Sequence, residues 1–140
     1  MKKLLLFFIS LPILSISQQT YVPDDNFETF LEINGMGNGV FYDDYVTTAN
    51  ISGVTILDVS YNYIADLTGI EDFAALDTLW CLTNQLTSLD VSNNTALTFL
   101  SCADNQLTSL DVSNNSALFS LDCSSNTSLT SLDVSGATAL

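Results

Sequence analysis

The stretch LTSLDVSNNTALTFLSCADNQLTSLDVSNN, residues 86–115, decides the fold, because it contains LTSLDVSNN twice, 21 residues apart. A third copy of LTSLDVS begins at residue 129, and Cys81, Cys102 and Cys123 follow the same 21-residue spacing. A fixed period of this length is typical of a solenoid, in which each repeat forms one coil that stacks on the next. We therefore expect a single repeat domain in which each coil contacts only its neighbours.

Each repeat divides into two similar halves. Apolar residues occupy positions 1, 4 and 6 of a half and alternate with polar ones, as in a strand with one buried face. Because both halves show this alternation, we expect a mostly β repeat solenoid, a flattened coil with short parallel strands on one or both faces. Position 9 is asparagine in every variable half, and its amide is expected to bond the backbone where the chain turns a corner. These residues are Asn62, Asn84, Asn105 and Asn126.

The three cysteines raise the question of disulfides, which are common in exported proteins. All three occupy inward position 6 of successive coils, where the other half carries Val91, Val112 and Val134. Cysteine at such a position behaves as a small hydrophobic residue, so we expect a ladder of buried free thiols. A zinc site would need four ligands and closer pairs, and none is predicted.

The N-terminal region does not repeat. Residues 1–17 have the pattern of an export signal peptide, with Lys2 and Lys3 before an apolar run and small residues before Gln18; the alternative is a buried N-terminal element. The apolar run is too short to span a membrane in the mature chain. Within residues 18–52, Pro23-Asp24-Asp25 predicts a helix start and Asn34-Gly35 its end. We expect this segment to be a small cap with one helix, followed by the solenoid over residues 53–140.

The chain stops at Leu140, the first residue of a new half-repeat. Because a solenoid needs its last coil sealed, we expect the solenoid to be truncated at its C-terminal end and to be part of a longer protein. The alternative is end-to-end self-association through the open coil, which size-exclusion chromatography would test.

The charge balance excludes several functions. Lys2 and Lys3 are the only basic residues, there is no histidine, and 16 residues are acidic, so the predicted mature chain has no cationic side chain. Nucleic acid and anionic membranes are therefore poor partners. The mature chain also has no His or Lys to activate a serine and no Arg or Lys to steady an oxyanion, so we do not expect an enzyme. Basic proteins, divalent cations and neutral glycans are the expected partners; alternatively, the charge serves only solubility.

These repeats resemble a known family. Residues 86–115 resemble bacterial leucine-rich repeats with a second L-x-x-L-D-V-x-x-N nested in each unit, and ISGVTILDVSYNYIADLTGIEDFAAL, residues 51–76, resembles internalin-type repeats. The lead-in YVPDDNFETFLE, residues 21–32, resembles the N-terminal cap of secreted leucine-rich-repeat proteins from bacteria that use type IX secretion. The resemblance implies a secreted or cell-surface scaffold that binds protein or glycan, without a cofactor. The alternatives are a passive structural spacer and a calcium-stabilised adhesion segment of a larger secreted protein.

The two halves differ in how much they vary. One half is LTSLDVS each time, whereas the other changes between coils, so features that a partner recognises are expected on this variable half. We predict its ligand-binding residues to be Trp80, Phe99, Ser101 and Asp122, with Phe119 just before its strand. Exposed aromatic side chains among polar residues mark interaction sites and also stack on sugar rings. The alternative is that the aromatic residues only cover the sheet edge or pack under the cap.

Two acidic patterns raise the question of calcium. Asp90, Asp111 and Asp133 form an outward ladder on the constant half, where calcium would relieve their repulsion, although a solvated face without metal is the more ordinary outcome. The loop over residues 34–39, with Asp43 and Asp44, has the glycines of a calcium loop but not its alternating carboxylates. No metal ligand is assigned, and weak calcium binding stays an alternative.

Overall fold

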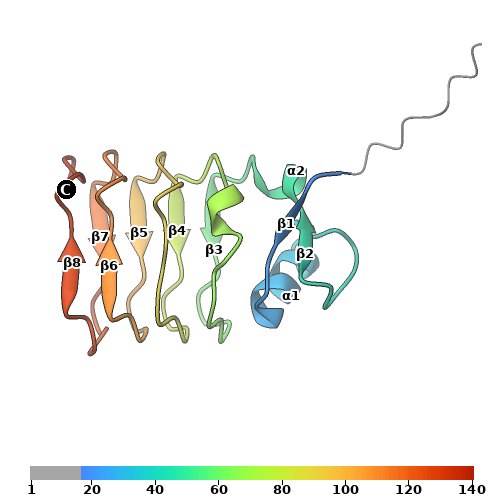
Figure 1. Ribbon diagram of the computed structural model, residues 1–140, viewed down its shortest axis with the longest axis horizontal. Helices are drawn as coiled ribbons and strands as arrows, with labels where there is room; N and C mark the ends of the chain where they lie inside the picture. The colour runs from blue at the N-terminus through green and yellow to red at the C-terminus, as the bar shows by residue number, and fades with distance from the viewer. Residues whose placement is uncertain (1–16) are drawn as a thin grey trace, which may run out of the picture.

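The structure, a computed structural model, describes residues 17–140, so the predicted export signal lies outside the described residues except for Ser17. Stacked coils extend from an N-terminal cap in a single row (Figure 1). The predicted solenoid is therefore confirmed. In the described part of the chain, no helix has the length and apolar character needed to cross a bilayer.

The cap combines two helices with a small antiparallel sheet. Its elements are β1 (Gln19–Tyr21), α1 (Asp25–Ile33), β2 (Tyr45–Thr47) and α2 (Thr48–Ile51). The predicted helix begins as expected, because Asp24 Oδ1 accepts the N–H groups of Asn26 and Phe27, each at 3.0 Å. It ends at Asn34, before Gly35 in the left-handed region at φ +72°. The β1–β2 pair was not predicted, since three-residue strands show too little alternation to be recognised.

The cap seals the open end of the solenoid core. Phe27 of α1 is fully buried and stacks on Phe73 of the first coil, with ring centroids 6.3 Å apart. Asp24 also bonds the first coil, because its Oδ2 accepts the N–H groups of Ala65 at 2.8 Å and Asp66 at 3.1 Å. One carboxylate therefore both caps α1 and fixes it to the repeats.

The strands of the variable half form one parallel sheet, in the order β3 (Ile56–Asp58), β4 (Thr78–Trp80), β5 (Phe99–Ser101), β7 (Ser120–Asp122). The constant half forms a second parallel pair, β6 (Ser109–Asp111) with β8 (Ser131–Asp133). The first coil returns instead through the 3₁₀ helix η1 (Ile70–Asp72). Strands on both faces are thus present, although residues 88–90 of the second coil lie in neither sheet.

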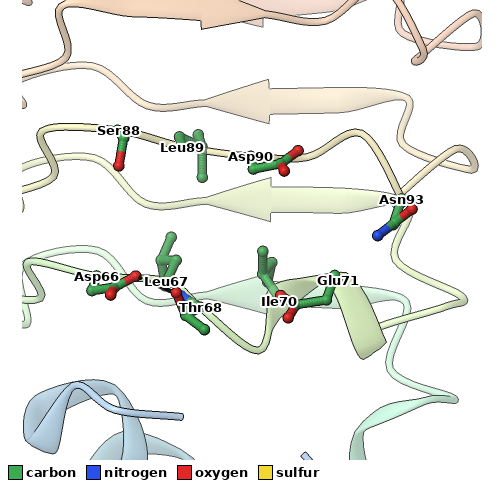
Figure 2. Close-up of a pocket in the computed structure, with 9 residues that line it drawn as sticks. All are labelled: Asp66, Leu67, Thr68, Ile70, Glu71, Ser88, Leu89, Asp90 and Asn93. Carbon is green, nitrogen blue, oxygen red and sulfur yellow. Dashed lines mark hydrogen bonds between the residues drawn. The ribbon is translucent and has the colours of Figure 1, made fainter. Parts of the chain in front are cut away.

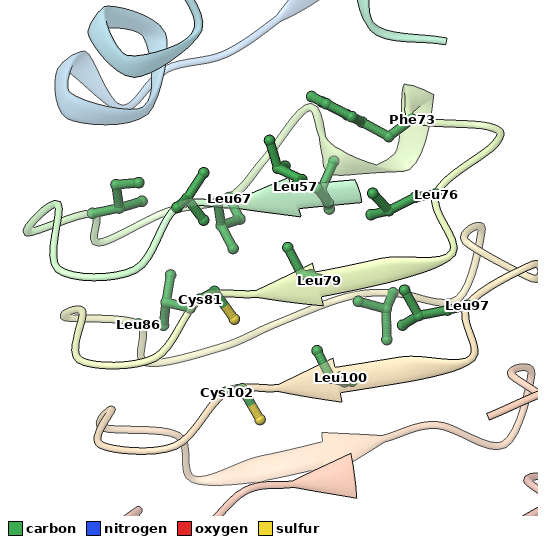
Figure 3. Packing of buried hydrophobic residues seen from close by; sticks show 14 of the residues in the cluster. Leu57, Leu67, Phe73, Leu76, Leu79, Cys81, Leu86, Leu97, Leu100 and Cys102 are labelled. Atoms are coloured by element: carbon green, nitrogen blue, oxygen red, sulfur yellow. The ribbon is translucent and has the colours of Figure 1, made fainter. Parts of the chain in front are cut away.

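Leucine and cysteine side chains stack in rows within the core (Figure 3). The parallel register places Leu57, Leu79 and Leu100 in one row, and each is at most 2% exposed. All three cysteines are free thiols, as predicted; Cys81 and Cys102 are buried and Cys123 is half-buried. Burial raises the pKa of Cys81 and raises that of Cys102 to about 12, so both thiols stay protonated at neutral pH.

The predicted corner role of asparagine is confirmed. Asn105 Nδ2 donates to the carbonyls of Cys81 at 2.9 Å and Cys102 at 3.1 Å, and its Oδ1 accepts the N–H of Leu86 at 3.0 Å. Asn84 and Asn126 repeat this pattern in their own coils. Each amide therefore joins two successive coils and satisfies backbone groups that the turn would otherwise leave buried without partners.

Candidate interaction surface

The outward face of the sheet β3–β4–β5–β7 carries the residues predicted for binding. Because side chains alternate along a strand and the coils are in register, its outward residues form two rows across the sheet. One row is Ile56, Thr78, Phe99 and Ser120; the other is Asp58, Trp80, Ser101 and Asp122. The surface therefore mixes apolar, hydroxyl and carboxylate side chains on a rigid backbone.

Trp80 and Phe99 meet on this face. They are diagonal neighbours on adjacent strands, and their ring centroids lie 5.8 Å apart with the planes tilted by 58°. Such an aromatic pair contributes about 0.5–1.5 kcal/mol beyond its buried area, which holds both rings in place before any partner arrives. Both side chains are half-buried, so part of each ring remains accessible.

Ile56 extends this apolar surface, and sequence reasoning missed it. The residue lies on β3 in the row that contains Phe99, and 59% of its surface is exposed. The repeat pattern could have identified it, because Ile56 holds the same outward position in the first coil as Phe99 does in the third. We call Ile56, Trp80 and Phe99 the sheet-face patch.

Ser101 and Phe119 differ in how much surface they offer to a partner. Ser101 faces outward in register but is only 6% exposed, because it is a small residue on an inner strand, between the larger Trp80 and Asp122. Ser101 therefore offers a partner little accessible surface. Phe119 is 63% exposed just before β7, where its N–H donates to Thr98, and among the described residues no ring pairing joins it to the sheet-face patch.

Asp122 is exposed, and its carboxylate is held by its own strand end. Its Oδ1 accepts the N–H of Ser124 at 3.0 Å and the Ser124 hydroxyl at 2.7 Å, and these bonds lower the pKa of Asp122. The same turn recurs at Asp58, Asp90, Asp111 and Asp133, each of which accepts the N–H of the serine two residues later. The acidic ladder therefore has a backbone-capping role that requires no metal.

The acidic residues of the cap also bond peptide groups. Glu28 is fully buried, and its two oxygens accept the N–H groups of Asp43 at 3.1 Å and Asp44 at 3.2 Å. Carboxylate oxygens of Asp25, Glu28 and Asp44 lie within 4.8 Å of one another. The glycine-rich loop over residues 34–39 is folded around Glu32, which accepts the N–H groups of Asn38 and Gly39.

Comparison with known proteins places this geometry among bacterial repeat proteins. No family model matches the chain. A 75-residue part, 54% of the chain, is 39% identical to Internalin J of Listeria monocytogenes serotype 4b (strain F2365), of which it covers 8%. The solved structure of an internalin C2 from L. monocytogenes str. 4b F2365 is similar with a TM-score of 0.69 and 25% identity, over 90% of this chain and 57% of that one. The solved structure of an internalin (inlF) from the same strain is similar with a TM-score of 0.66 and 24% identity, over 86% of this chain and 42% of that one.

The stacked parallel strands and their asparagine corners define a leucine-rich-repeat solenoid. With the likeness in sequence to Internalin J and in fold to internalin C2, the chain is an internalin-like bacterial leucine-rich-repeat protein. It spans 57% of the internalin C2 chain and a small part of Internalin J.

Proposed function

We propose that this chain is a binding scaffold that contacts a protein partner through the sheet-face patch. The observation that carries the proposal is the packed Trp80–Phe99 pair, which lies on an outward sheet face that also bears the exposed Ile56. Aromatic residues that are fixed in place and surrounded by polar side chains are the usual energetic centre of a protein interface. The likeness to internalin C2, a repeat scaffold of the same shape, supports this function.

The shape of the patch favours a protein over a sugar. A sheet face offers a broad, rigid surface, which suits the contact area of a protein interface better than a small-molecule site. The rings of Trp80 and Phe99 are tilted by 58°, so they do not form one flat platform on which a pyranose could lie. Asp58 and Asp122 lie in the row of Trp80, so a partner with cationic groups around an apolar centre fits this surface.

We also propose that the scaffold acts outside the cell or on its surface. The export pattern over residues 1–17 supports this location. In this proposal residues 18–52 form the cap, residues 53–140 form the solenoid that presents the patch, and the role is binding rather than catalysis.

A double substitution tests the binding face. Purified protein is immobilised to capture partners from extracellular extracts, and an identified partner is then titrated against variants. Trp80→Ser/Phe99→Ser should weaken binding more than tenfold, because interface aromatics carry much of the affinity, and should leave the far-UV circular dichroism spectrum unchanged.

The matched control is Tyr61→Ser/Tyr63→Ser, which removes two exposed aromatic rings from the corner of the first coil. This control should keep wild-type affinity. Equal binding by wild-type protein and the Trp80→Ser/Phe99→Ser variant would contradict the proposal, and binding to neutral oligosaccharides alone would replace the protein partner with a glycan.

A further inference from the structure

A groove crosses the first three coils on the side of the constant half. Two adjoining hollows, of about 270 and 350 Å³, share residues Ser88, Leu89 and Asp90 of the second coil. In the first hollow these residues lie across from the return segment of the first coil, which includes Asp66, Leu67 and Glu71 (Figure 2). The second hollow continues to β6 of the third coil. We call this feature the return-side groove.

The groove exists because residues 88–90 do not pair with a strand. They have the same sequence as β6, yet no backbone hydrogen bond joins Ser88, Leu89 or Asp90 to either neighbouring coil. Hydrogen bonds join the segment to the third coil only near its ends. There the carbonyl groups of Leu86 and Val91 accept hydrogen bonds from residues of the third coil. On the other side the first coil supplies η1 in place of a strand. The hollows therefore lie where the constant half does not form a sheet.

Four carboxylates line the groove, and each is already oriented. One oxygen of every carboxylate accepts a backbone N–H at 2.8–2.9 Å, and the other oxygen has no hydrogen-bond partner within residues 17–140. The pairs are Asp66 with Thr68, Glu71 with Gly69, Asp90 with Ser92, and Asp111 with Ser113. A carboxylate held in this way loses little conformational freedom when it binds a cation.

The groove also has an apolar component. Leu67 is buried and Leu89 is half-buried, and both line the same hollow as Asp66 and Asp90. A long cationic side chain matches this arrangement, because its aliphatic stem packs on apolar surface while its charged head reaches the carboxylates. The chain itself supplies no such head, since residues 17–140 contain no lysine, arginine or histidine.

We propose that the return-side groove binds an extended, arginine-containing segment of a partner protein. A guanidinium donates charge-assisted hydrogen bonds to carboxylate oxygens, and Asp66 and Asp90, which line the same hollow, each have one oxygen that accepts no hydrogen bond from the described residues. The aliphatic part of the arginine side chain would pack on Leu89 between the carboxylates. This site is independent of the sheet-face patch, because it uses the other half of the coil.

The test measures peptide binding by purified protein at fixed salt in the presence of EDTA. The probe is acetyl-(Gly-Arg)3-amide, and acetyl-(Gly-Gln)3-amide is its neutral counterpart. The arginine peptide should bind and the glutamine peptide should not. Asp66→Asn/Asp90→Asn should weaken binding at least tenfold, because asparagine keeps the oxygen that accepts the backbone N–H but removes the charge.

The control removes the same charge elsewhere. Asp25→Asn/Asp104→Asn alters two exposed positions outside the groove and should change affinity less than twofold. Equal weakening by both double variants would show attraction to the overall acidity and would overturn the proposal, as would unchanged binding by Asp66→Asn/Asp90→Asn.

Two further variants keep the result interpretable. If circular dichroism shows that Asp66→Asn/Asp90→Asn is unfolded, Glu71→Gln replaces it and should weaken binding at least threefold; unchanged affinity in that variant overturns the proposal. Trp80→Ser/Phe99→Ser should bind the arginine peptide as the wild type does. A failure of this site is therefore distinguishable from a failure of the sheet-face patch.

Discussion

The constant half of the coil is the more regular in sequence, but the variable half is the more completely hydrogen-bonded. The variable half pairs one strand from each of four coils, whereas the three copies of LTSLDVS give only the pair β6–β8. The copy at residues 86–92 has η1 of the first coil on one side instead of a strand. On its other side lies β6, an extended strand, and no backbone hydrogen bond joins the two, so an identical sequence in adjacent coils does not by itself form a sheet.

The corner asparagines show the same contrast. Asn105 in the variable half uses both ends of its amide, whereas Asn115 in the constant half donates to Val91 and Asn94 but leaves its buried Oδ1 without a partner among the described residues. The next core leucine follows Asn115 by three residues but follows Asn105 by two, so the turns after these two asparagines differ. The variable half therefore satisfies its buried corner amides more completely than the constant half does.

The largest expected effect compares leucines at the same position of the two halves. Leu100→Ala should lower the free energy of unfolding by about 3–4 kcal/mol, because it leaves a cavity in a fully buried row. Leu89→Ala should cost only about 1 kcal/mol, because this side chain is half-buried beside the groove. Urea unfolding followed by circular dichroism measures both. Equal losses would mean that the two halves contribute alike to the core.

The corner asparagines provide the next comparison. Asn105→Ala should cost about 2–3 kcal/mol, because it leaves buried groups of two coils unpaired on both the donor and the acceptor side. Asn115→Ala should cost about 1–2 kcal/mol, because only its donor side is used. The same urea titration measures both. A larger loss of unfolding free energy in Asn115→Ala than in Asn105→Ala would contradict the distinction between the corner asparagines of the two halves.

Features that depend on local alternation were predictable from the sequence. The inward cysteines, the corner asparagines and the caps of α1 all follow from spacing within one repeat or one turn. Features that depend on the neighbouring coil were not. The contact of Trp80 with Phe99 needs the register between strands, and the burial of Ser101 depends on the sizes of the residues beside it. The missing pairing of residues 88–90 depends on the backbones of both neighbouring coils.

The residue before each corner asparagine sharpens the comparison at a smaller scale. In the variable half it is left-handed, and Thr83 at φ +54° is a β-branched residue in a region that glycine prefers. Thr83→Gly should raise the free energy of unfolding by about 0.5–1 kcal/mol. Asn93, at the same position in the constant half, has no positive φ, so Asn93→Gly should lower it by about 0.5 kcal/mol. Destabilisation by Thr83→Gly would contradict this account.

The smallest expected effect concerns the aspartates at the strand ends. Hydrogen bonds from the side chain and the backbone of Ser124 lower the pKa of Asp122, and Ser92 does the same for Asp90 in the constant half. Because the pKa is lower in the folded chain, each bond stabilises the fold above the ordinary aspartate pKa of about 4, and this contribution is lost as the pH falls through the folded pKa. Ser124→Ala and Ser92→Ala should each raise the pKa of their own aspartate and reduce this acid-dependent loss.

Carboxyl-carbon NMR titration of wild type and both variants measures these pKa values, and thermal unfolding between pH 3 and 7 measures the accompanying loss of stability. Each serine variant serves as the control for the other, because Asp122 belongs to the variable half and Asp90 to the constant half. A shift confined to the substituted turn would show that the two halves close their strand ends by the same local bond. A pKa of Asp122 that is unchanged in Ser124→Ala would assign the lowering to the backbone N–H of residue 124, which alanine keeps, and the serine hydroxyl would then not explain why serine follows the aspartate by two residues in both halves.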